Sequence, residues 1–241
     1  MVFLHPVGLD LTYWGDQIEA LNGDYDVVAP DLPGHGRTPG SATEWTLSRA
    51  TATVAQFLSS LGSPRVHLVG LSVGGMLAQA LAIERPELVQ SLTLIDTAAS
   101  FTDDSRDVMR QRSRDVRLGG MLAVVDSTLE RWFMPATFIA RPDVVERVRK
   151  TLLGDDPAVH AAMWDMIGSL DLVAELPRIR CPTQVVVGEF DPSSPLAAAR
   201  QLRDGIPAAG LRVIPQASHL SPLEKPAVVN ELLRCFLPTA C

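Results

Sequence analysis

The chain has 241 residues, of which 46% are hydrophobic and 20% are charged, and its formal net charge is −7. This length accommodates one α/β domain with a smaller inserted part. The acidic balance argues against a nucleic acid partner, because phosphate backbones would be repelled. No apolar run approaches the roughly 20 residues that span a bilayer, so no membrane partner is expected.

The chain has three cysteines, Cys181, Cys235 and Cys241, and they show neither CxxC spacing nor companion histidines at metal-ligand intervals. An odd number of such cysteines indicates reduced thiols and no metal site. The first residues also lack a basic stretch followed by an apolar one, so no signal peptide is predicted. Together these features predict a cytoplasmic protein.

Short hydrophobic segments alternate with helical ones in residues 1–98 and again in residues 178–241. The hydrophobicity of the strand candidates is continuous, which fits strands that are buried on both faces. The predicted strands are residues 2–5, 25–29, 66–71, 91–96, 184–188 and 211–214. The predicted helices are residues 16–21, 47–61, 74–84 and 195–204. This alternation predicts an α/β fold with a mostly parallel sheet and helices on both faces.

The alternation stops in residues 99–177, where helical periodicity continues without a convincing strand. Residues 106–118 carry many charges, and amphipathic helices are predicted at 122–133, 143–153 and 158–167. Prolines punctuate these helices. We therefore predict that residues 99–177 form a helical cap, inserted between the two parts of the core.

A nucleophile motif is centred on Ser72, which has Gly70 and Gly74 two positions away on either side. The pattern G-x-S-x-G alone is weak, since chance produces it in about one chain in twelve of this length. Here it directly follows a predicted strand and directly precedes a predicted helix, as a nucleophile elbow requires. Larger residues beside the serine would clash with the crossing backbone. We predict that Ser72 is a nucleophile, and a simple glycine-rich turn is the alternative.

A hydroxyl nucleophile needs a base, and the elbow motif implies the chain order serine, acid, histidine. Only His160 and His219 follow Ser72. His219 follows the last predicted strand, at the end of the sheet where sites of parallel sheets gather. Ser221 is predicted to cap the next helix, with Pro222 as the first helical residue. We predict His219 as the base, and His160 as a surface or partly buried residue of the cap.

The acid that orients the histidine is predicted to be Asp191, which follows the strand at 184–188. Glu189 and Asp96 also follow strands and are the reserve candidates. A turn or capping role is the other interpretation of Asp191.

Two backbone N–H groups are expected to receive the negative charge that develops on the substrate carbonyl oxygen. Val73 follows the nucleophile and is one predicted donor. The loop after the first strand reads His5-Pro6-Val7-Gly8, and because proline has no N–H, Val7 is predicted to be the second donor. A plain turn that ends the strand is the alternative.

These residues resemble the α/β-hydrolase superfamily and, within it, the 3-oxoadipate enol-lactonases, over nearly the whole chain. The similar segments are residues 31–36, 70–76, 131–133 and 219–226. The resemblance implies an enzyme that opens a lactone bearing a free carboxylate, without a metal or organic cofactor. Arg131 would pair with that carboxylate, and Trp132 would line the acyl pocket. A solvated arginine and a core tryptophan are the alternative interpretation.

The sequence departs from this family in two places. Family members carry two more strands before the first strand found here, and their absence would expose a sheet edge along residues 25–29. Another element or a second subunit, as in a homodimer, would then cover the edge, or the chain would begin further upstream. In addition, His5 and Pro6 stand where many relatives have His-Gly or Asn-Ser, which leaves the substrate open.

We therefore expect a serine hydrolase that cleaves a small carboxylic ester or lactone through an acyl-enzyme. A carboxylesterase of broad specificity and a C–C bond hydrolase of aromatic ring-cleavage products are the enzyme alternatives. A ligand-binding receptor on the same fold is the alternative outside enzymes. Dehalogenase and epoxide hydrolase chemistry is disfavoured, because those relatives use an aspartate where this chain has Ser72.

Overall fold

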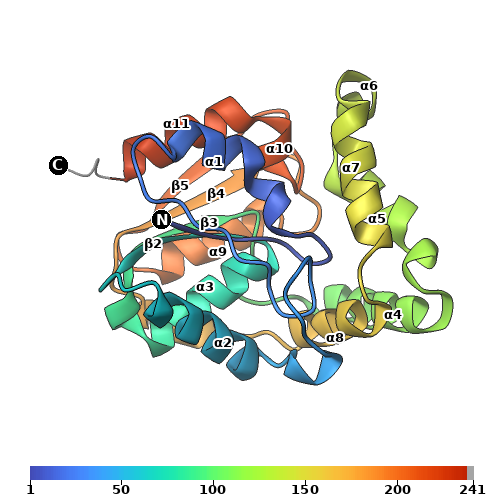
Figure 1. The fold of residues 1–241 in the computed structure, drawn as a ribbon, viewed down its shortest axis with the longest axis horizontal. Coiled ribbons are helices and arrows are strands. Elements are labelled where there is room, and N and C mark those ends of the chain that lie inside the picture. The colour runs from blue at the N-terminus through green and yellow to red at the C-terminus, as the bar shows by residue number, and fades with distance from the viewer. Residues whose placement is uncertain (238–241) are drawn as a thin grey trace.

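A computed structural model describes residues 1–237 of the chain. Five strands form one sheet in which every pair of neighbours is parallel (Figure 1). In sheet order, which is also chain order, they are β1 (Val2–Leu4), β2 (Val66–Leu71), β3 (Val89–Ile95), β4 (Thr183–Gly188) and β5 (Gly210–Ile214). Because all strands run the same way, their carboxyl ends lie along one edge of the sheet.

Helices cover both faces of the sheet, as predicted. In Figure 1, α1 (Gly15–Leu21) and α11 (Pro226–Phe236) lie on one face, next to the short α10 (Ser221–Glu224). The other face carries α2 (Leu47–Ser60), α3 (Val73–Glu84) and α9 (Leu196–Gly205). Every residue of β4 is buried, which agrees with its continuous hydrophobicity. Short 3₁₀ segments occur at Leu11–Trp14, Ala42–Glu44, Pro86–Leu88, Met121–Ala123 and Val173–Arg178.

The strand predicted at residues 25–29 is wrong, because only an isolated parallel bridge between Val28 and Val2 forms there. Val28 donates its N–H to the carbonyl of Met1 and accepts the N–H of Phe3, both at 2.9 Å. β1 offers only three residues for pairing, and the following Pro30 has no N–H to donate. The ladder therefore ends after these two bonds.

The segment predicted as a cap contains five α-helices between β3 and β4, which stand beside the sheet in Figure 1. They are α4 (Asp103–Gly119), α5 (Val125–Trp132), α6 (Pro135–Ala140), α7 (Pro142–Leu153) and α8 (Pro157–Gly168). The sequence did not predict α6. Near the two ends of this segment, Ser100 and Asp171 form an antiparallel bridge. No helix in residues 1–237 is long and apolar enough to cross a membrane.

Two of the three cysteines lie in the described part of the chain. Cys181 is partly buried and Cys235 is exposed, and both are free thiols. Cys241 lies outside the described residues.

Candidate active site

Ser72 occupies a strained turn between β2 and α3. Its φ of 53° and ψ of −120° lie in a region that residues other than glycine rarely adopt, at a cost of about 1–3 kcal/mol. The turn is held on both sides. The N–H of Ser72 donates to the carbonyl of Ile95 at 3.0 Å, and the hydroxyl of Thr97 donates to the carbonyl of Ser72 at 2.7 Å. The geometry is that of a nucleophile elbow.

The glycines around Ser72 are required by close backbone contacts. A Cβ at Gly70 would lie 2.4 Å from the carbonyl oxygen of Gly74, and a Cβ at Gly74 would lie 2.3 Å from the carbonyl oxygen of Leu4. Both distances are too short for any side chain. The second contact also shows that the start of α3 crosses directly behind the end of β1, so the elbow and the loop after β1 are neighbours.

The structure brings His219 and Asp191 together in a buried pair. His219 Nδ1 lies 2.9 Å from Asp191 Oδ2, and both side chains are almost completely buried. The other carboxylate oxygen, Oδ1, accepts the N–H groups of Ser193 at 2.8 Å and Ser194 at 3.1 Å. These bonds fix the carboxylate, which in turn places the proton of a neutral imidazole on Nδ1. His219 Nε2 is then free to accept a proton.

Ser72 Oγ and His219 Nε2 have no hydrogen-bond partner among residues 1–237, and neither is sealed from solvent. They are the two atoms that proton transfer would join. Catalytic hydrogen bonds are often long or open in ligand-free sites and tighten when substrate binds.

The two N–H groups predicted to bind the oxyanion are also unpaired. In the described chain neither the N–H of Val7 nor that of Val73 donates to a protein acceptor. Val73 is the first residue of α3, where an N–H has no partner within the helix. The loop that carries Val7 is fixed by its neighbours, because Gly8 donates its N–H to His35 Nε2 at 3.3 Å and Leu32 donates its N–H to His5 Nε2 at 2.8 Å.

The two reserve acids, Asp96 and Glu189, are engaged elsewhere. Asp96 is buried after β3 and accepts the N–H of Gly188 at 2.7 Å and the hydroxyl of Ser221 at 2.6 Å. Glu189 accepts the N–H of Gln216 at 3.0 Å. Burial is the main cause that raises the pKa of Asp96 well above its usual value, and the charge of Asp191 is the second. Of the three carboxylates, only Asp191 pairs with the histidine.

The predicted N-cap at Ser221 is wrong by one residue. Leu220 occupies the N-cap position of α10, and Ser221 is the first helical residue. The hydroxyl of Ser221 is drawn to Asp96 instead of the helix end. Glu224, which would complete a capping box, instead accepts the N–H groups of Ser218 and Met134. Tertiary partners thus replace the local capping pattern.

Arg131 and Trp132 are attached through their backbone to the loop that carries His219. The hydroxyl of Ser218 donates to the carbonyl of Arg131, and the N–H of Leu220 donates to the carbonyl of Trp132, both at 3.2 Å. The ring of Trp132 is buried, with its centroid 6.0 Å from that of His219. The cap therefore places these two residues beside the His219–Asp191 pair.

One interpretation of the sequence was a solvated Arg131, but its side chain is only partly exposed. Its Nε donates to Ser193 Oγ at 3.2 Å, while its Nη2 is enclosed and has no partner. Burial is the main cause that lowers the pKa of Arg131 to about 9, and the charge of Arg112 is the second.

A buried histidine cluster, which the sequence did not predict, links the cap to the loop after β1. The carboxylate of Asp155, just before α8, accepts a hydrogen bond from His160 Nδ1 at 2.7 Å. It also lies 3.6 Å from His35 Nε2. His160 is almost fully buried rather than at the surface. The ring centroids of His35 and His5 lie 5.2 Å apart, with the two rings tilted by 54°. Histidines that are far apart in the chain carry no sequence signal of this arrangement.

The histidine cluster predicts a loss of stability in acid. Burial is the main cause that lowers the pKa of His5 to about 3, and the charge of His35 is the second. Burial also lowers the pKa of His35. The unfolded chain, with histidine pKa values of about 6.5, then binds more protons than the folded one below that pH. We expect the free energy of unfolding to fall as the pH drops from about 6.5 toward 3. Urea titrations across this range would measure the fall, and His35→Gln should make it shallower. An equally steep fall in that variant would contradict the assignment.

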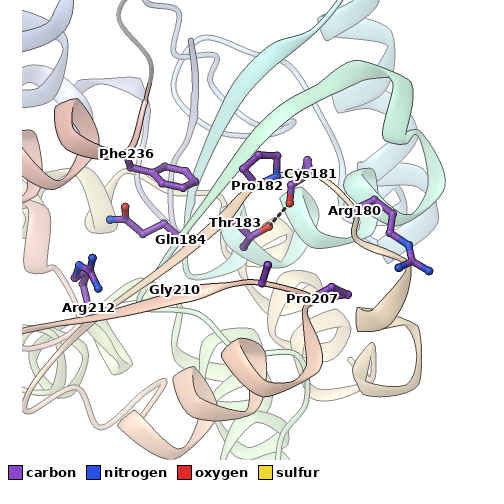
Figure 2. Close-up of a pocket in the computed structure, with 10 residues that line it drawn as sticks. Arg180, Cys181, Pro182, Thr183, Gln184, Pro207, Gly210, Arg212 and Phe236 are labelled. Atoms are coloured by element: carbon purple, nitrogen blue, oxygen red, sulfur yellow. Dashed lines mark hydrogen bonds between the residues drawn. The ribbon is translucent and has the colours of Figure 1, made fainter.

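A surface cavity of about 430 Å³ lies at the opposite end of the strands from Ser72. Figure 2 shows it beside Thr183 and Gly210, the first residues of β4 and β5, with the Thr183 hydroxyl donating to the carbonyl of Cys181 at 3.0 Å. Phe236 of α11 also lines it. Since Ser72, Asp191 and His219 follow the carboxyl ends of strands, this cavity is separate from the candidate active site.

A serine on a strained elbow, with a histidine–aspartate pair after neighbouring parallel strands, defines the α/β-hydrolase class. A family model described as the alpha/beta hydrolase family matches residues 1–232. The chain therefore belongs to the α/β-hydrolase family, which confirms the predicted fold.

Two kinds of relatives support this assignment. The 3-oxoadipate enol-lactonase 2 of Acinetobacter baylyi is 27% identical over 237 residues, which cover 98% of this chain and 88% of the relative. The crystal structure of the enol-lactonase from Burkholderia xenovorans LB400 is 29% identical, with a TM-score of 0.91 over 98% of this chain and 90% of that chain. A malate-bound thermophilic esterase from Thermogutta terrifontis is 32% identical, with a TM-score of 0.89 over 97% and 87% of the two chains. The resemblance to enol-lactonases is thus confirmed.

Proposed function

We propose that this protein hydrolyses a carboxylic ester or lactone through an acyl-enzyme on Ser72, as a 3-oxoadipate enol-lactonase-like enzyme. One combination of features carries the proposal. Ser72 occupies a strained elbow, and the N–H groups of Val7 and Val73 are unpaired. His219 is bonded to Asp191 through Nδ1, which leaves its Nε2 free. Nucleophile, oxyanion donors and oriented base are the parts that acyl transfer needs.

In the proposed reaction, Ser72 Oγ attacks the carbonyl carbon while His219 Nε2 takes the hydroxyl proton. The oxyanion accepts hydrogen bonds from the N–H groups of Val7 and Val73. Asp191 stabilises the imidazolium through Nδ1. The tetrahedral intermediate collapses as the bond from the carbonyl carbon to the leaving oxygen breaks, and Nε2–H protonates that oxygen. Water, deprotonated by His219, then releases the acid and restores Ser72.

The proposed substrate carries a free carboxylate near the scissile bond. Arg131 supports this, since a partly buried guanidinium with an unused Nη2 is a strong donor to a carboxylate. Trp132, whose ring lies beside that of His219, is proposed to line the acyl pocket. The names of two relatives, an enol-lactonase and a malate-bound esterase, are consistent with an acidic substrate.

Covalent labelling tests the nucleophile. We expect a fluorophosphonate probe to modify the protein rapidly, and peptide mass spectrometry to locate the adduct on Ser72. The reason is that a phosphonyl group forms the same kind of tetrahedral adduct in the oxyanion hole. Ligand binding without labelling would favour the receptor alternative, and an adduct on another residue would contradict the proposal.

A substrate panel separates the remaining enzyme alternatives. The enol-lactone, simple p-nitrophenyl esters and a ring-cleavage dienoate present the same site with different bonds to break. Highest kcat/KM on the lactone supports the proposed function. Similar values on all esters would indicate a broad carboxylesterase, and turnover of the dienoate alone would indicate a C–C hydrolase.

A further inference from the structure

Two arginines from different helices of the cap converge on one indole ring. Arg112 of α4 has its guanidinium carbon 5.0 Å from the ring centroid of Trp164 on α8. Arg131 of α5 has its guanidinium carbon 5.9 Å from the same centroid. Cations attract an aromatic face at such distances, but two cations on one ring repel each other. The packing of three helices therefore holds like charges together.

Neither Arg112 nor Arg131 has an acidic side chain within ion-pair distance in the described part of the chain. Other arginines of the cap do find one, as Arg110 does with Asp107 on α4. The guanidinium of Arg112 also makes no hydrogen bond to a described residue. Its contact with the indole is the one attraction that the structure provides.

The two guanidiniums are also partly shielded from water. Burial lowers the pKa of Arg112 to about 10, while burial and the nearby Arg112 lower that of Arg131 to about 9. Both groups thus remain charged at neutral pH. The charge of Asp191 acts in the opposite direction on the pKa of Arg131, but its effect is smaller than those of burial and Arg112, and no ion pair joins the two side chains. Shielded charges without a counter-ion are unfavourable, so an anion is expected to bind there.

Unused donors show which kind of anion fits. The enclosed Nη2 of Arg131 has no partner, and its Nη1 reaches only the carbonyl of Ser127 at 3.4 Å. No guanidinium N–H of Arg112 donates to a described residue. A planar carboxylate can accept two parallel N–H bonds from a guanidinium, whereas a spherical anion cannot. The unused donors therefore favour a carboxylate.

Hydrogen bonds fix the indole of Trp164 on one side of the site and connect Arg131 to the proposed triad on the other. Trp164 donates its Nε1–H to His160 Nε2 at 3.0 Å, and His160 is held by Asp155. On the other side, Arg131 donates to Ser193, whose N–H is bonded to Asp191. An anion bound here would lie near Asp191, the residue that orients His219.

We propose that Arg112 and Arg131, on the platform of Trp164, form one anion site that selects esters and lactones with a free carboxylate. Arg112 is the specificity-determining residue that this site adds, and the inference rests on the proposed function. The carboxylate of the substrate neutralises both guanidiniums, while the ester carbonyl reaches Ser72.

Matched esters test the site. p-Nitrophenyl hemiglutarate and p-nitrophenyl butyrate share a leaving group and differ mainly in the terminal carboxylate. We expect Arg112→Gln to lower the ratio of their kcat/KM values by about 10- to 100-fold, because a charge-assisted interaction is lost. The loss should arise from a higher KM for the hemiglutarate. Turnover of the butyrate should be kept, which shows that the variant folds.

Arg110→Gln is the matched control, since Arg110 lies on the same helix but is exposed and paired with Asp107; its ratio should stay at the wild-type value. Arg131→Gln should lower the ratio as Arg112→Gln does. The fold-loss in the double variant should be smaller than the product of the two single fold-losses, since both arginines bind the same carboxylate. An unchanged ratio in Arg112→Gln would overturn the proposal.

Calorimetry separates this inference from the proposed function. We expect glutarate to bind the wild-type protein and to bind Arg112→Gln about tenfold or more weakly. If glutarate binds in this way but neither ester is cleaved, the anion site stands and the proposed reaction fails. If the esters are cleaved but glutarate binds both proteins equally or neither, the site fails and the reaction stands.

Discussion

Replacing Ser72 by alanine should lower kcat for the lactone and for p-nitrophenyl esters by about 10⁵- to 10⁶-fold, which is the scale seen when a serine hydrolase loses its nucleophile. The acyl-enzyme cannot form without Oγ, and water is not positioned to replace it. The proposed oxyanion donors, the N–H groups of Val7 and Val73, belong to the backbone and stay in place, so a small residual rate above that of water is expected.

The Ser72→Ala measurement needs evidence that the fold is kept. Alanine fits the elbow no worse than serine, because both meet the same strain at a φ of 53°. Thermal unfolding should therefore be nearly unchanged, and glutarate should still bind. Ser59→Ala, on the partly exposed side of α2, is a suitable control and should retain full activity. Appreciable turnover by Ser72→Ala would remove Ser72 from the mechanism.

The elbow could be predicted from sequence because its requirements are local. Glycines at positions 70 and 74 follow from backbone contacts within the motif and with the adjacent strand. The hydrophobic run before Ser72 forms β2 with the bounds predicted for it. The order of Ser72, Asp191 and His219 along the chain also pointed to the observed Asp191–His219 pair, since each follows the carboxyl end of a parallel strand.

Features decided by tertiary packing could not be predicted in this way. Asp155 and Asp156 stand side by side before α8, where either could cap the helix. Asp156 accepts the N–H of Ala158 at 2.7 Å, while Asp155 turns to His160. Nothing in the local sequence distinguishes them, because the choice depends on where the cap meets the core.

The same reason explains the anion site and the failed strand. Arg112 lies in the charged helix α4, whose sequence does not show that Trp164 of α8 packs against it. Residues 25–29 have the composition of a strand, but a strand also needs a partner of matching length, and β1 supplies three residues. Periodicity predicts elements, and the docking between them decides the rest.

Replacing Asp191 by asparagine should lower kcat by about 10⁴-fold, as seen for the equivalent change in a serine protease triad. Asparagine would donate its amide N–H to Nδ1 of His219, which moves the imidazole proton to Nε2. A protonated Nε2 cannot accept the proton of Ser72. Rates measured at saturating substrate separate this effect from any change in substrate binding.

Asp96→Asn is the decisive comparison, because Asp96 is the other buried carboxylate at the strand ends. Asparagine can still accept the N–H of Gly188, but its amide group would face the N–H of Ser221, which now donates to the carboxylate at 3.2 Å. Losing that bond should destabilise the fold by about 1–3 kcal/mol, visible in the urea midpoint. Because Asp96 does not touch His219, kcat should fall by less than about tenfold. A large loss of kcat in Asp96→Asn, with activity kept in Asp191→Asn, would transfer the role of the acid to Asp96.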